Sequence, residues 1–303
     1  MYSFLKPGVL PDPLPAKAPF IPRIIWQTTR DRHAIKPQLA QCVQAVKDMN
    51  PNWEHRQFDD QLQYEFLSRV CSDRFMAVYD RVQPKYGAAK ADLFRYVAVF
   101  LYGGAYMDLK SGTTRPLDEI LRPDDHFIIS QWDNGPDGAF PGLGLNKDLK
   151  HIPGGEYEQW FVIASPGHPF LAAIIEQAMA NAENHNPFRF GHGGKGVLNV
   201  FGPNVYTLSI RALEAKHPHR KICAWHEGLK YTLLEDLHAH QRIDSGHYNR
   251  VYLPPVTPKN LSPLKAFMFN LNETIYWPIS KLRSLNHARL RRRAIRKGKP
   301  IDR

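Results

Sequence analysis

The segment from Tyr86 to Asp108, YGAAKADLFRYVAVFLYGGAYMD, constrains the fold more than any other part of the chain. Apolar residues recur at helical spacing from Leu93 to Phe100, and the Gly103-Gly104 pair ends the helix that they predict. The residues that follow, Ala105 to Asp108, have the pattern of a short buried strand. The sequence therefore predicts a helix, a reversal of the chain, and a strand that returns along the helix.

The lengths of these two elements predict where Asp108 lies. The helix from Asp92 to Tyr102 is about 15 Å long, and the strand from Gly104 to Asp108 returns about 13 Å. Asp108 is then expected beside Asp92 and Arg95. These two are three residues apart on one helical face, so a structural ion pair between them is one interpretation. The other is a ligand site, because open α/β sheets bind ligands at the carboxyl ends of their strands.

The pattern around this segment predicts an α/β fold whose sheet begins as a parallel one. Residues 22–27 (PRIIWQ) and 53–60 (WEHRQFDD) are patterned as strands, and residues 36–49 between them as a helix. A strand, a helix and a strand within about 40 residues begin a βαβ arrangement. Residues 160–165 (WFVIAS) predict a further strand, with a helix starting near Pro169.

Five blocks between residue 21 and about residue 210 carry a resemblance to a known family. They are IPRIIWQT, NPNWEHRQFDD, AKADLFRYVAVFLYGGAYMDLKSG, WFVIASPGHPF and FGPNVYT. Together they resemble family 32 of the DXD-containing glycosyltransferases, the group of Och1-type mannosyltransferases and capsular-sugar transferases. The core motif is also similar to that of the glucosyltransferase domains of large clostridial toxins. The specific part is the string A-x-A-D-x-x-R-Y followed by Y-G-G-x-Y-x-D.

The resemblance implies both a fold and a reaction. The fold would be of the GT-A type, a nucleotide-sugar-binding α/β domain with a Rossmann-like mixed sheet and flanking helices. The reaction would move a hexose from a UDP- or GDP-linked sugar to a glycan or glycolipid acceptor, with retention of the anomeric configuration, in surface polysaccharide synthesis.

The motif also implies the roles of individual residues. By position in it, Asp92, Arg95, Gly104 and Tyr106 are expected to bind the donor sugar. Asp108 stands at the first DXD aspartate, and the resemblance places it near the ribose, the sugar and the metal ion.

Three further residues are assigned by resemblance to the nucleotide end of the donor. Trp26 and Gln27 stand in the first-strand motif, which usually reads isoleucine-histidine-glutamine in the family. Trp26 either stacks on the donor base, a contact worth about 1–3 kcal/mol by analogy with other base stacking, or is a core tryptophan. His247 matches a histidine-containing C-terminal loop of the family and is a candidate for the phosphates or a metal ion.

Lys110 departs from the family, because it stands where the second DXD aspartate is expected. An ammonium group there removes an oxygen ligand and repels a cation, which puts binding of Mn²⁺ or Mg²⁺ in doubt. We interpret Lys110 as a charge that stabilises the leaving diphosphate in place of part of the ion's role. Two alternatives remain: Lys110 points into solvent, or the chain is a non-catalytic nucleotide-sugar or glycan-binding protein that has kept the fold.

The region after this motif is expected to supply the acceptor loops. Glu156 or the Asp133-Asn134 pair would orient the acceptor hydroxyl, although as solvated loop residues they need no such role, and we favour that interpretation. The glycine-rich residues 191–196 lack the spacing of a phosphate-binding loop and are interpreted as a mobile loop near the acceptor.

The chain divides into three parts by composition. Residues 1–20 hold five prolines and predict an extended arm, residues 21–260 form the GT-A-type domain, and residues 261–303 predict a helical, basic appendage. The three cysteines have no paired spacing, which predicts neither a disulfide framework nor a zinc site.

The net charge of +11 is concentrated at one end of the sequence. Residues 281–303 contain ten Lys or Arg and one Asp, so the rest of the chain is nearly neutral and no nucleic-acid partner is expected. The basic residues follow an aromatic segment that includes Phe267, Phe269, Tyr276 and Trp277, a combination suited to an anionic membrane surface. Nucleic-acid binding is the competing use of the same charges, and a tail that only aids solubility is the other alternative. We expect a cytoplasmic protein that is peripheral on the inner face of the membrane.

Overall fold

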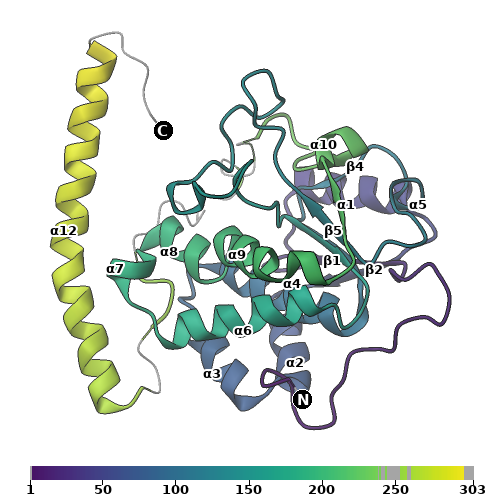
Figure 1. Cartoon of the computed structure of the whole chain (residues 1–303), viewed down its shortest axis with the longest axis horizontal. Helices are drawn as coiled ribbons and strands as arrows, with labels where there is room; N and C mark the ends of the chain where they lie inside the picture. The colour runs from purple at the N-terminus through teal and green to yellow at the C-terminus, as the bar shows by residue number, and fades with distance from the viewer. Residues whose placement is uncertain (1, 238, 240–242, 244–252, 258–260, 297–303) are drawn as a thin grey trace.

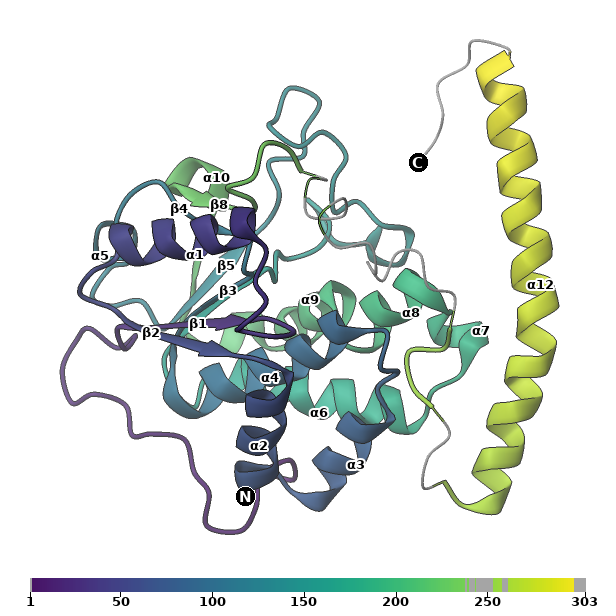
Figure 2. The ribbon, with the colours of Figure 1, turned by 180° about the vertical axis from the view of Figure 1, so that it is seen from behind.

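A computed structural model describes residues 2–237, 239, 243, 253–257 and 261–296 of the chain (Figures 1 and 2). Its centre is a six-stranded sheet in the order β2-β1-β3-β6-β5-β7. The strands are β1 (Ile24–Thr28), β2 (Glu54–Phe58), β3 (Gly104–Met107), β5 (Phe127–Ser130), β6 (Phe161–Ala164) and β7 (Arg220–Ile222). A second, two-stranded sheet pairs β4 (Gly112–Thr113) with β8 (Leu229–Lys230).

The sheet is mixed, and this confirms the fold class expected from the sequence. β1 pairs in parallel with both β2 and β3, as the βαβ pattern predicts. β6 is antiparallel to both of its neighbours, β3 and β5, and β5 is parallel to β7. The carboxyl ends of β1, β3 and β5 therefore meet the amino end of β6 at one edge of the sheet.

Helices cover both faces of the sheet. α2, α3, α4, α6, α8 and α9 contribute to the larger core, and α1, α5 and α10 to the smaller one on the opposite face. Their bounds are α1 (Pro37–Met49), α2 (Asp60–Val70), α3 (Asp73–Arg81), α4 (Gly87–Tyr102), α5 (Leu117–Ile120), α6 (Pro169–Glu183), α8 (Gly193–Val200), α9 (Pro203–Leu213) and α10 (Ala224–Glu227). The remaining helices are α7 (Pro187–Phe190), α12 (Pro263–Arg296) and two short 3-10 turns, Lys147–Leu149 and Glu214–Lys216.

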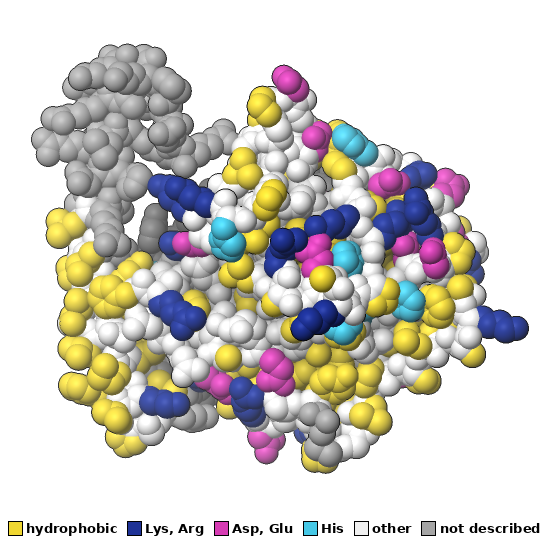
Figure 3. Space-filling view, in the orientation of Figure 1, with side chains coloured by type: hydrophobic (Ala, Val, Ile, Leu, Met, Phe, Trp, Pro, Cys, Tyr) yellow, Lys and Arg dark blue, Asp and Glu magenta, His cyan; other side chains and the backbone are white. Residues whose placement is uncertain are grey.

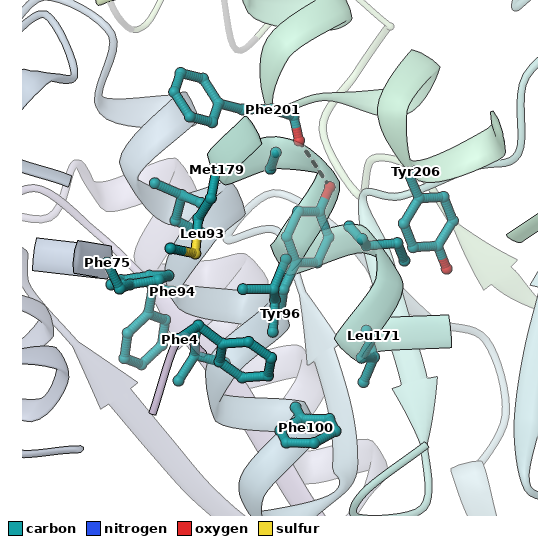
Figure 4. Packing of buried hydrophobic residues seen from close by; sticks show 14 of the residues in the cluster. Phe4, Phe75, Leu93, Phe94, Tyr96, Phe100, Leu171, Met179, Phe201 and Tyr206 are labelled. Carbon is teal, nitrogen blue, oxygen red and sulfur yellow. Dashed lines mark hydrogen bonds between the residues drawn. The ribbon is translucent and has the colours of Figure 1, made fainter. Parts of the chain in front are cut away.

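Side chains alternate between the two cores along each central strand. Trp26 and Tyr106 point into the larger core, whereas Ile25 and Ala105, one position earlier, point into the smaller one. Figure 4 shows the larger core, where Tyr96 of α4 donates its hydroxyl to the carbonyl of Phe201 at 3.0 Å. Burial on both faces fixes the register of the strands, because a slip of one residue would exchange the two sets of side chains.

The reversal predicted between α4 and β3 depends on two glycines in left-handed conformations. Gly103 ends the helix with a φ of 66°, and Gly104 begins the strand with a φ of 97°. A Cβ atom on Gly104 would lie 2.5 Å from the carbonyl oxygen of Ile24 in β1. β3 can therefore approach β1 this closely only with glycine at position 104.

The N-terminal arm is attached to the core more firmly than the sequence predicts. Phe4 is fully buried, and its ring centroid lies 5.3 Å from that of Phe100 near the end of α4. Leu5 forms an isolated bridge with Cys71. The stretch from Pro7 to Phe20 contains no helix or strand and lies along the surface, with Asp12 donating its amide to the carbonyl of Leu101 (Figure 1). The first residues pack as part of the domain.

In the C-terminal appendage, residues Pro263–Arg296 form a single long helix, α12, beside the domain, as Figures 1 and 2 show. α12 lies next to α7 and extends beyond the domain at its C-terminal end. Within the described ranges, none of the helices combines the length and the apolar character needed to cross a membrane.

Candidate active site

A cavity of about 430 Å³ opens at the edge of the sheet where β1, β3 and β5 end and β6 begins. Short segments next to these strands form its floor, and α2, α4 and α8 supply its walls. At the carboxyl ends of β1 and β3 the lining residues are Thr28 to Arg30 and Asp108 to Lys110. Before β6 they are Glu156 and Glu158 to Trp160. The position agrees with the rule that open α/β sheets bind ligands at carboxyl ends of strands.

Four charged residues form a network on the floor of this cavity. The guanidinium of Arg95 contacts Asp92 at 3.1 Å and Asp108 at 3.3 Å. The other carboxylate oxygen of Asp108 lies 2.8 Å from Nζ of Lys110. Asp92 and Arg95 therefore form the ion pair that was one interpretation. They also line the cavity with Asp108, as the interpretation of a ligand site requires.

Neighbouring groups fix the orientation of Arg95. It donates to the carbonyl of Gln159 at 2.5 Å, and its guanidinium carbon lies 4.2 Å from the centroid of the Tyr106 ring. The Tyr106 hydroxyl in turn lies 2.9 Å from Thr28 Oγ1 and donates to Asp108 at 3.3 Å. Helix α4 and strands β1 and β3 are therefore joined through a single buried set of polar contacts.

Lys110 points into the protein, which excludes the interpretation that it points into solvent. Its side chain is 8% exposed, and Nζ lies 4.1 Å from the centroid of the Tyr231 ring. Burial works against the charged form of Lys110, but Asp108 outweighs it and raises the pKa of Lys110. Burial likewise disfavours the charge on Asp108, but Lys110 and Arg95 hold its pKa below the usual value. Both groups are therefore charged at neutral pH.

Asp92 differs from Asp108 in its protonation. Burial raises the pKa of Asp92 to about 7, and Arg95 counteracts this only in part. The two carboxyl groups differ because Asp92 has only a share of the Arg95 guanidinium beside it. Asp108 shares the same guanidinium and also has Lys110 as a second cation. Asp92 also accepts a hydrogen bond from Gln159 at 3.3 Å.

A second pair of carboxyl groups lies in the cavity wall before β6. Glu156 accepts hydrogen bonds from Trp132 at 3.0 Å and Asn146 at 3.3 Å, and burial raises its pKa. Glu156 is half-buried and lines the cavity, so it is not the freely solvated loop residue that the sequence favoured. Asp133 lies outside the cavity lining and accepts a hydrogen bond from the amide of Ala139 within its own loop.

Glu158 is a buried carboxyl group of the cavity wall that the sequence did not indicate. It is 5% exposed and accepts hydrogen bonds from Ser130 Oγ and from Trp160 Nε1, the latter at 2.8 Å. Burial raises the pKa of Glu158 to about 7. The only signal in the sequence was its place just before a buried strand, which does not distinguish a buried carboxyl group from an exposed one.

Gln63 of α2 was also missed. It lines the cavity, is 2% exposed, and its Oε1 has no hydrogen-bond partner within the described part of the chain. A buried acceptor without a partner costs free energy, so a ligand with an N–H or O–H donor would be stabilised here.

The structure places Trp26, Gln27 and Gly104 behind the cavity floor rather than on its surface. Trp26 is 1% exposed and donates to the carbonyl of Gly103 at 2.9 Å, so it occupies the core position that was the alternative to base stacking. Gln27 is fully buried and donates to the backbone carbonyl of Asp108 at 3.5 Å. These residues support the site from below.

Two other expectations concern the C-terminal half of the domain. Residues 193–200 form helix α8, not a mobile loop, and Val197 and Leu198 contribute to the cavity wall. His247 lies outside the described residues.

The donor set around Asp108 does not fit a divalent cation. Both carboxylate oxygens of Asp108 already contact cationic groups, Arg95 and Lys110. Among the residues that the structure describes, no three His, Cys, Asp or Glu side chains are grouped so as to hold a metal ion. A hard cation prefers several carboxylate or carbonyl oxygens, and here an ammonium group occupies the place beside the carboxylate.

Comparisons with known proteins bear on this region. Residues 37–127 match the family model described as a glycosyltransferase sugar-binding region containing a DXD motif. This part of the chain includes Asp92, Arg95, Asp108 and Lys110.

Curated relatives match a longer part of the chain. An initiation-specific alpha-1,6-mannosyltransferase of Schizosaccharomyces pombe is 22% identical over 63% of this chain and 48% of its own length. A mannosyl phosphorylinositol ceramide synthase of Saccharomyces cerevisiae is 31% identical over 58% of this chain and 47% of its own length. The chain thus spans about half the length of these relatives.

Among solved structures, the UDP-bound glycosyltransferase domain from the YGT toxin aligns with a TM-score of 0.46 and 10% identity. The alignment covers 71% of this chain and 81% of that domain. The family model and the curated relatives confirm the resemblance to DXD-containing glycosyltransferases that the motifs indicated.

Proposed function

We propose that the protein is a glycosyltransferase that moves a hexose from a UDP- or GDP-linked sugar to a glycan or glycolipid acceptor, with retention of the anomeric configuration. The observation that carries the proposal is the network of Asp92, Arg95, Asp108 and Lys110 on the cavity floor. The names of the curated relatives, which are mannosyltransferases and a mannosyl ceramide synthase, support a hexose donor and such acceptors.

The lining of the cavity suits a sugar nucleotide. Carboxyl groups and Arg95 offer hydrogen bonds to sugar hydroxyls, and Trp132, Trp160 and Tyr231 offer aromatic faces. Arg30 and Lys85 add cationic side chains to the lining. The cavity therefore combines hydroxyl-binding groups with positive charge for a diphosphate.

We assign the stabilisation of the leaving group to Lys110. When the bond between the sugar and the diphosphate breaks, negative charge grows on the phosphate oxygens, and a fixed cation in a water-poor site lowers the energy of that charge. Lys110 is fixed by Asp108 and Tyr231 before any ligand binds. We therefore propose that turnover does not require a divalent ion.

A donor-release assay tests both statements. The purified chain is incubated with a panel of UDP- and GDP-hexoses, with EDTA in one series and Mn²⁺ in the other, and free nucleotide is measured. Release from at least one donor in EDTA, lost in the Asp108→Asn variant, is the expected result. Activity that EDTA abolishes and Mn²⁺ fully restores would refute metal independence and leave the transferase proposal intact.

The second candidate is a non-catalytic protein that binds nucleotide sugars or glycans. The observation that favours it is the replacement of the second DXD aspartate by Lys110. It predicts measurable donor binding by calorimetry together with no nucleotide release from any donor, with or without Mn²⁺. That combination would overturn the catalytic proposal.

A further inference from the structure

Among the described side chains of α12, Phe269, Glu273 and Tyr276 contact the domain. Phe269 is 6% exposed, and its ring centroid lies 5.9 Å from that of His185. One turn further, Glu273 lies 2.8 Å from Nε2 of His192, and the ring of Tyr276 lies 4.4 Å from the same histidine. Phe269 and Tyr276, which the sequence suggested as membrane contacts, therefore face the domain.

Another side of α12 carries exposed apolar side chains. We call it the outer stripe, and it consists of six side chains that are 40–71% exposed: Leu264, Phe267, Met268, Leu271, Ile275 and Leu282. Leu264 and Met268 also line a cavity of about 300 Å³ beside Arg81 and His185 of the domain, and the other four do not. Their spacing of i, i+3, i+4, i+7, i+11 and i+18 places all six on one side of the helix, over five turns. In Figure 3 hydrophobic side chains gather along the left edge of the molecule, over the lower part of α12.

Single exposed apolar residues are normal on a protein surface, but a continuous stripe of this length is not. Asn270 and Thr274, also exposed, lie beside the stripe and carry polar side chains, so the stripe has a polar flank on that side. Exposure of these apolar side chains to water is unfavourable in free energy, and each turn of the stripe adds to it. Burial of the stripe in an apolar phase would remove this unfavourable term.

The charge that follows the stripe favours an anionic surface as its partner. The chain from residue 281 to residue 303 contains ten Lys or Arg and one Asp. A second copy of α12 packed in parallel on the stripe would bring two such segments together, and like charges repel. An anionic lipid surface complements both features, because its acyl chains accept the stripe and its headgroups attract the basic segment.

We propose that α12 lies in the plane of an anionic membrane, with the outer stripe buried about 5–10 Å into the boundary between headgroups and acyl chains. The 34-residue helix would then lie along the surface for about 51 Å. Its inner face keeps the domain attached through Phe269 and Glu273, so the domain rests on the bilayer beside the helix. This inference does not depend on the proposed catalytic activity.

Vesicle sedimentation with two matched double variants tests the proposal. Leu271→Ser with Ile275→Ser changes the stripe, whereas Asn270→Ser with Thr274→Ser changes the positions immediately before them on the polar flank. Full-length protein is mixed with vesicles of phosphatidylcholine alone or with phosphatidylglycerol added. We expect wild type and the flank variant to bind the anionic vesicles equally, and the stripe variant to bind at least about tenfold more weakly.

Three outcomes would overturn the proposal. Equal binding of all three proteins would show that the stripe does not insert, and equal binding of wild type to neutral and anionic vesicles would remove the role of charge. Absence of vesicle binding, with a dimer by analytical ultracentrifugation that only the stripe variant loses, would assign the stripe to a second copy of the chain. Circular dichroism of each variant checks that α12 remains helical.

Discussion

The ammonium nitrogen of Lys110 lies 2.8 Å from a carboxylate oxygen of Asp108, two residues earlier in the chain, and both side chains face the cavity. This ion pair stands where a carboxylate pair is expected from the DXD motif. The positive charge at this point of the site is thus part of the polypeptide.

The first prediction concerns the exchange of this charge for a metal ion. Lys110→Asp restores two carboxylates at the motif and removes the ammonium group. We expect nucleotide release in EDTA to fall by about 10²–10³ in kcat, the usual cost of losing one electrostatic stabiliser, and Mn²⁺ to restore part of it. Lys150→Asp, an exposed position outside the cavity, is the charge control. Full activity of Lys110→Asp in EDTA would remove Lys110 from the mechanism.

The second prediction concerns the fork geometry of Arg95. Lysine keeps the charge but cannot contact Asp92, Asp108 and the Gln159 carbonyl at once. We expect Arg95→Lys to lower the free energy of unfolding by about 2 kcal/mol and to reduce kcat/KM. Arg74→Lys is the matched control, because Arg74 pairs with Glu183 at the surface and its replacement should cost less than about 1 kcal/mol. Urea denaturation measures the free energy of unfolding of both variants. Equal losses of stability in Arg95→Lys and Arg74→Lys would contradict a special role for Arg95.

The third prediction concerns pH. Burial raises the pKa of Glu158 to about 7 from 4.5 in the unfolded chain, so the folded state binds the proton more tightly. The resulting stabilisation is fully present below pH 4.5 and is lost as the pH rises through about 7. Glu158→Gln mimics the protonated form at every pH. We expect the variant to match wild type in acid and to be more stable at pH 8, by up to about 3 kcal/mol.

Urea midpoints of both proteins across this pH range provide the measurement for Glu158. Glu119→Gln, at an exposed position of α5, is the control and should leave the pH dependence of wild type unchanged. A difference between wild type and Glu158→Gln that stays constant with pH would mean that folding does not change the pKa of Glu158, which would contradict the shift.

The fourth prediction concerns the contact of β3 with β1. Gly104→Ala places a Cβ atom 2.5 Å from the Ile24 carbonyl at a φ of 97°, and we expect a loss of about 3 kcal/mol in stability. Gly87→Ala, at the first residue of α4, has no atom within 4 Å of the added carbon and should stabilise by about 0.5–1 kcal/mol. Thermal unfolding compares the two, and similar effects from both would disprove the steric argument.

The fifth prediction separates binding from folding at Gln63. Gln63→Met removes a buried acceptor that has no partner within the described residues, so stability should stay equal or rise by about 1 kcal/mol. In wild type, an N–H or O–H group of the bound nucleotide would donate to Gln63 Oε1. We therefore expect the nucleotide to bind Gln63→Met more weakly. Isothermal titration with UDP and GDP measures the nucleotide affinity, and thermal unfolding measures the stability. Unchanged affinity for both nucleotides would exclude Gln63 from their binding.

The core of the site could be predicted from the sequence because it depends on local geometry. The helical spacing of α4, the two glycines and the length of β3 are enough to bring Asp108 back to Asp92 and Arg95. Each of these follows from residues close together in the chain. The same applies to the first two strands and to the helix between them.

Other residues could not be placed in this way because their positions depend on contacts between distant segments. β1 is covered by apolar residues on both faces, so its sequence does not show whether Trp26 points toward a ligand or into the core. Glu158 is buried by Ser130, which lies 28 residues earlier. Phe4 belongs to a proline-rich segment whose composition resembles a free arm, and only its packing against Phe100 shows otherwise.

The contact between Glu273 and His192 joins α12 to the residue immediately before α8, and α8 forms part of the cavity wall. With the outer stripe in a bilayer, this contact holds the cavity at a constant height above the lipid surface. An acceptor carried by a lipid would then reach the site by lateral diffusion. Its rate of encounter would be governed by how many acceptors occupy each unit of membrane area, and dilution of the surrounding solution would leave that rate unchanged.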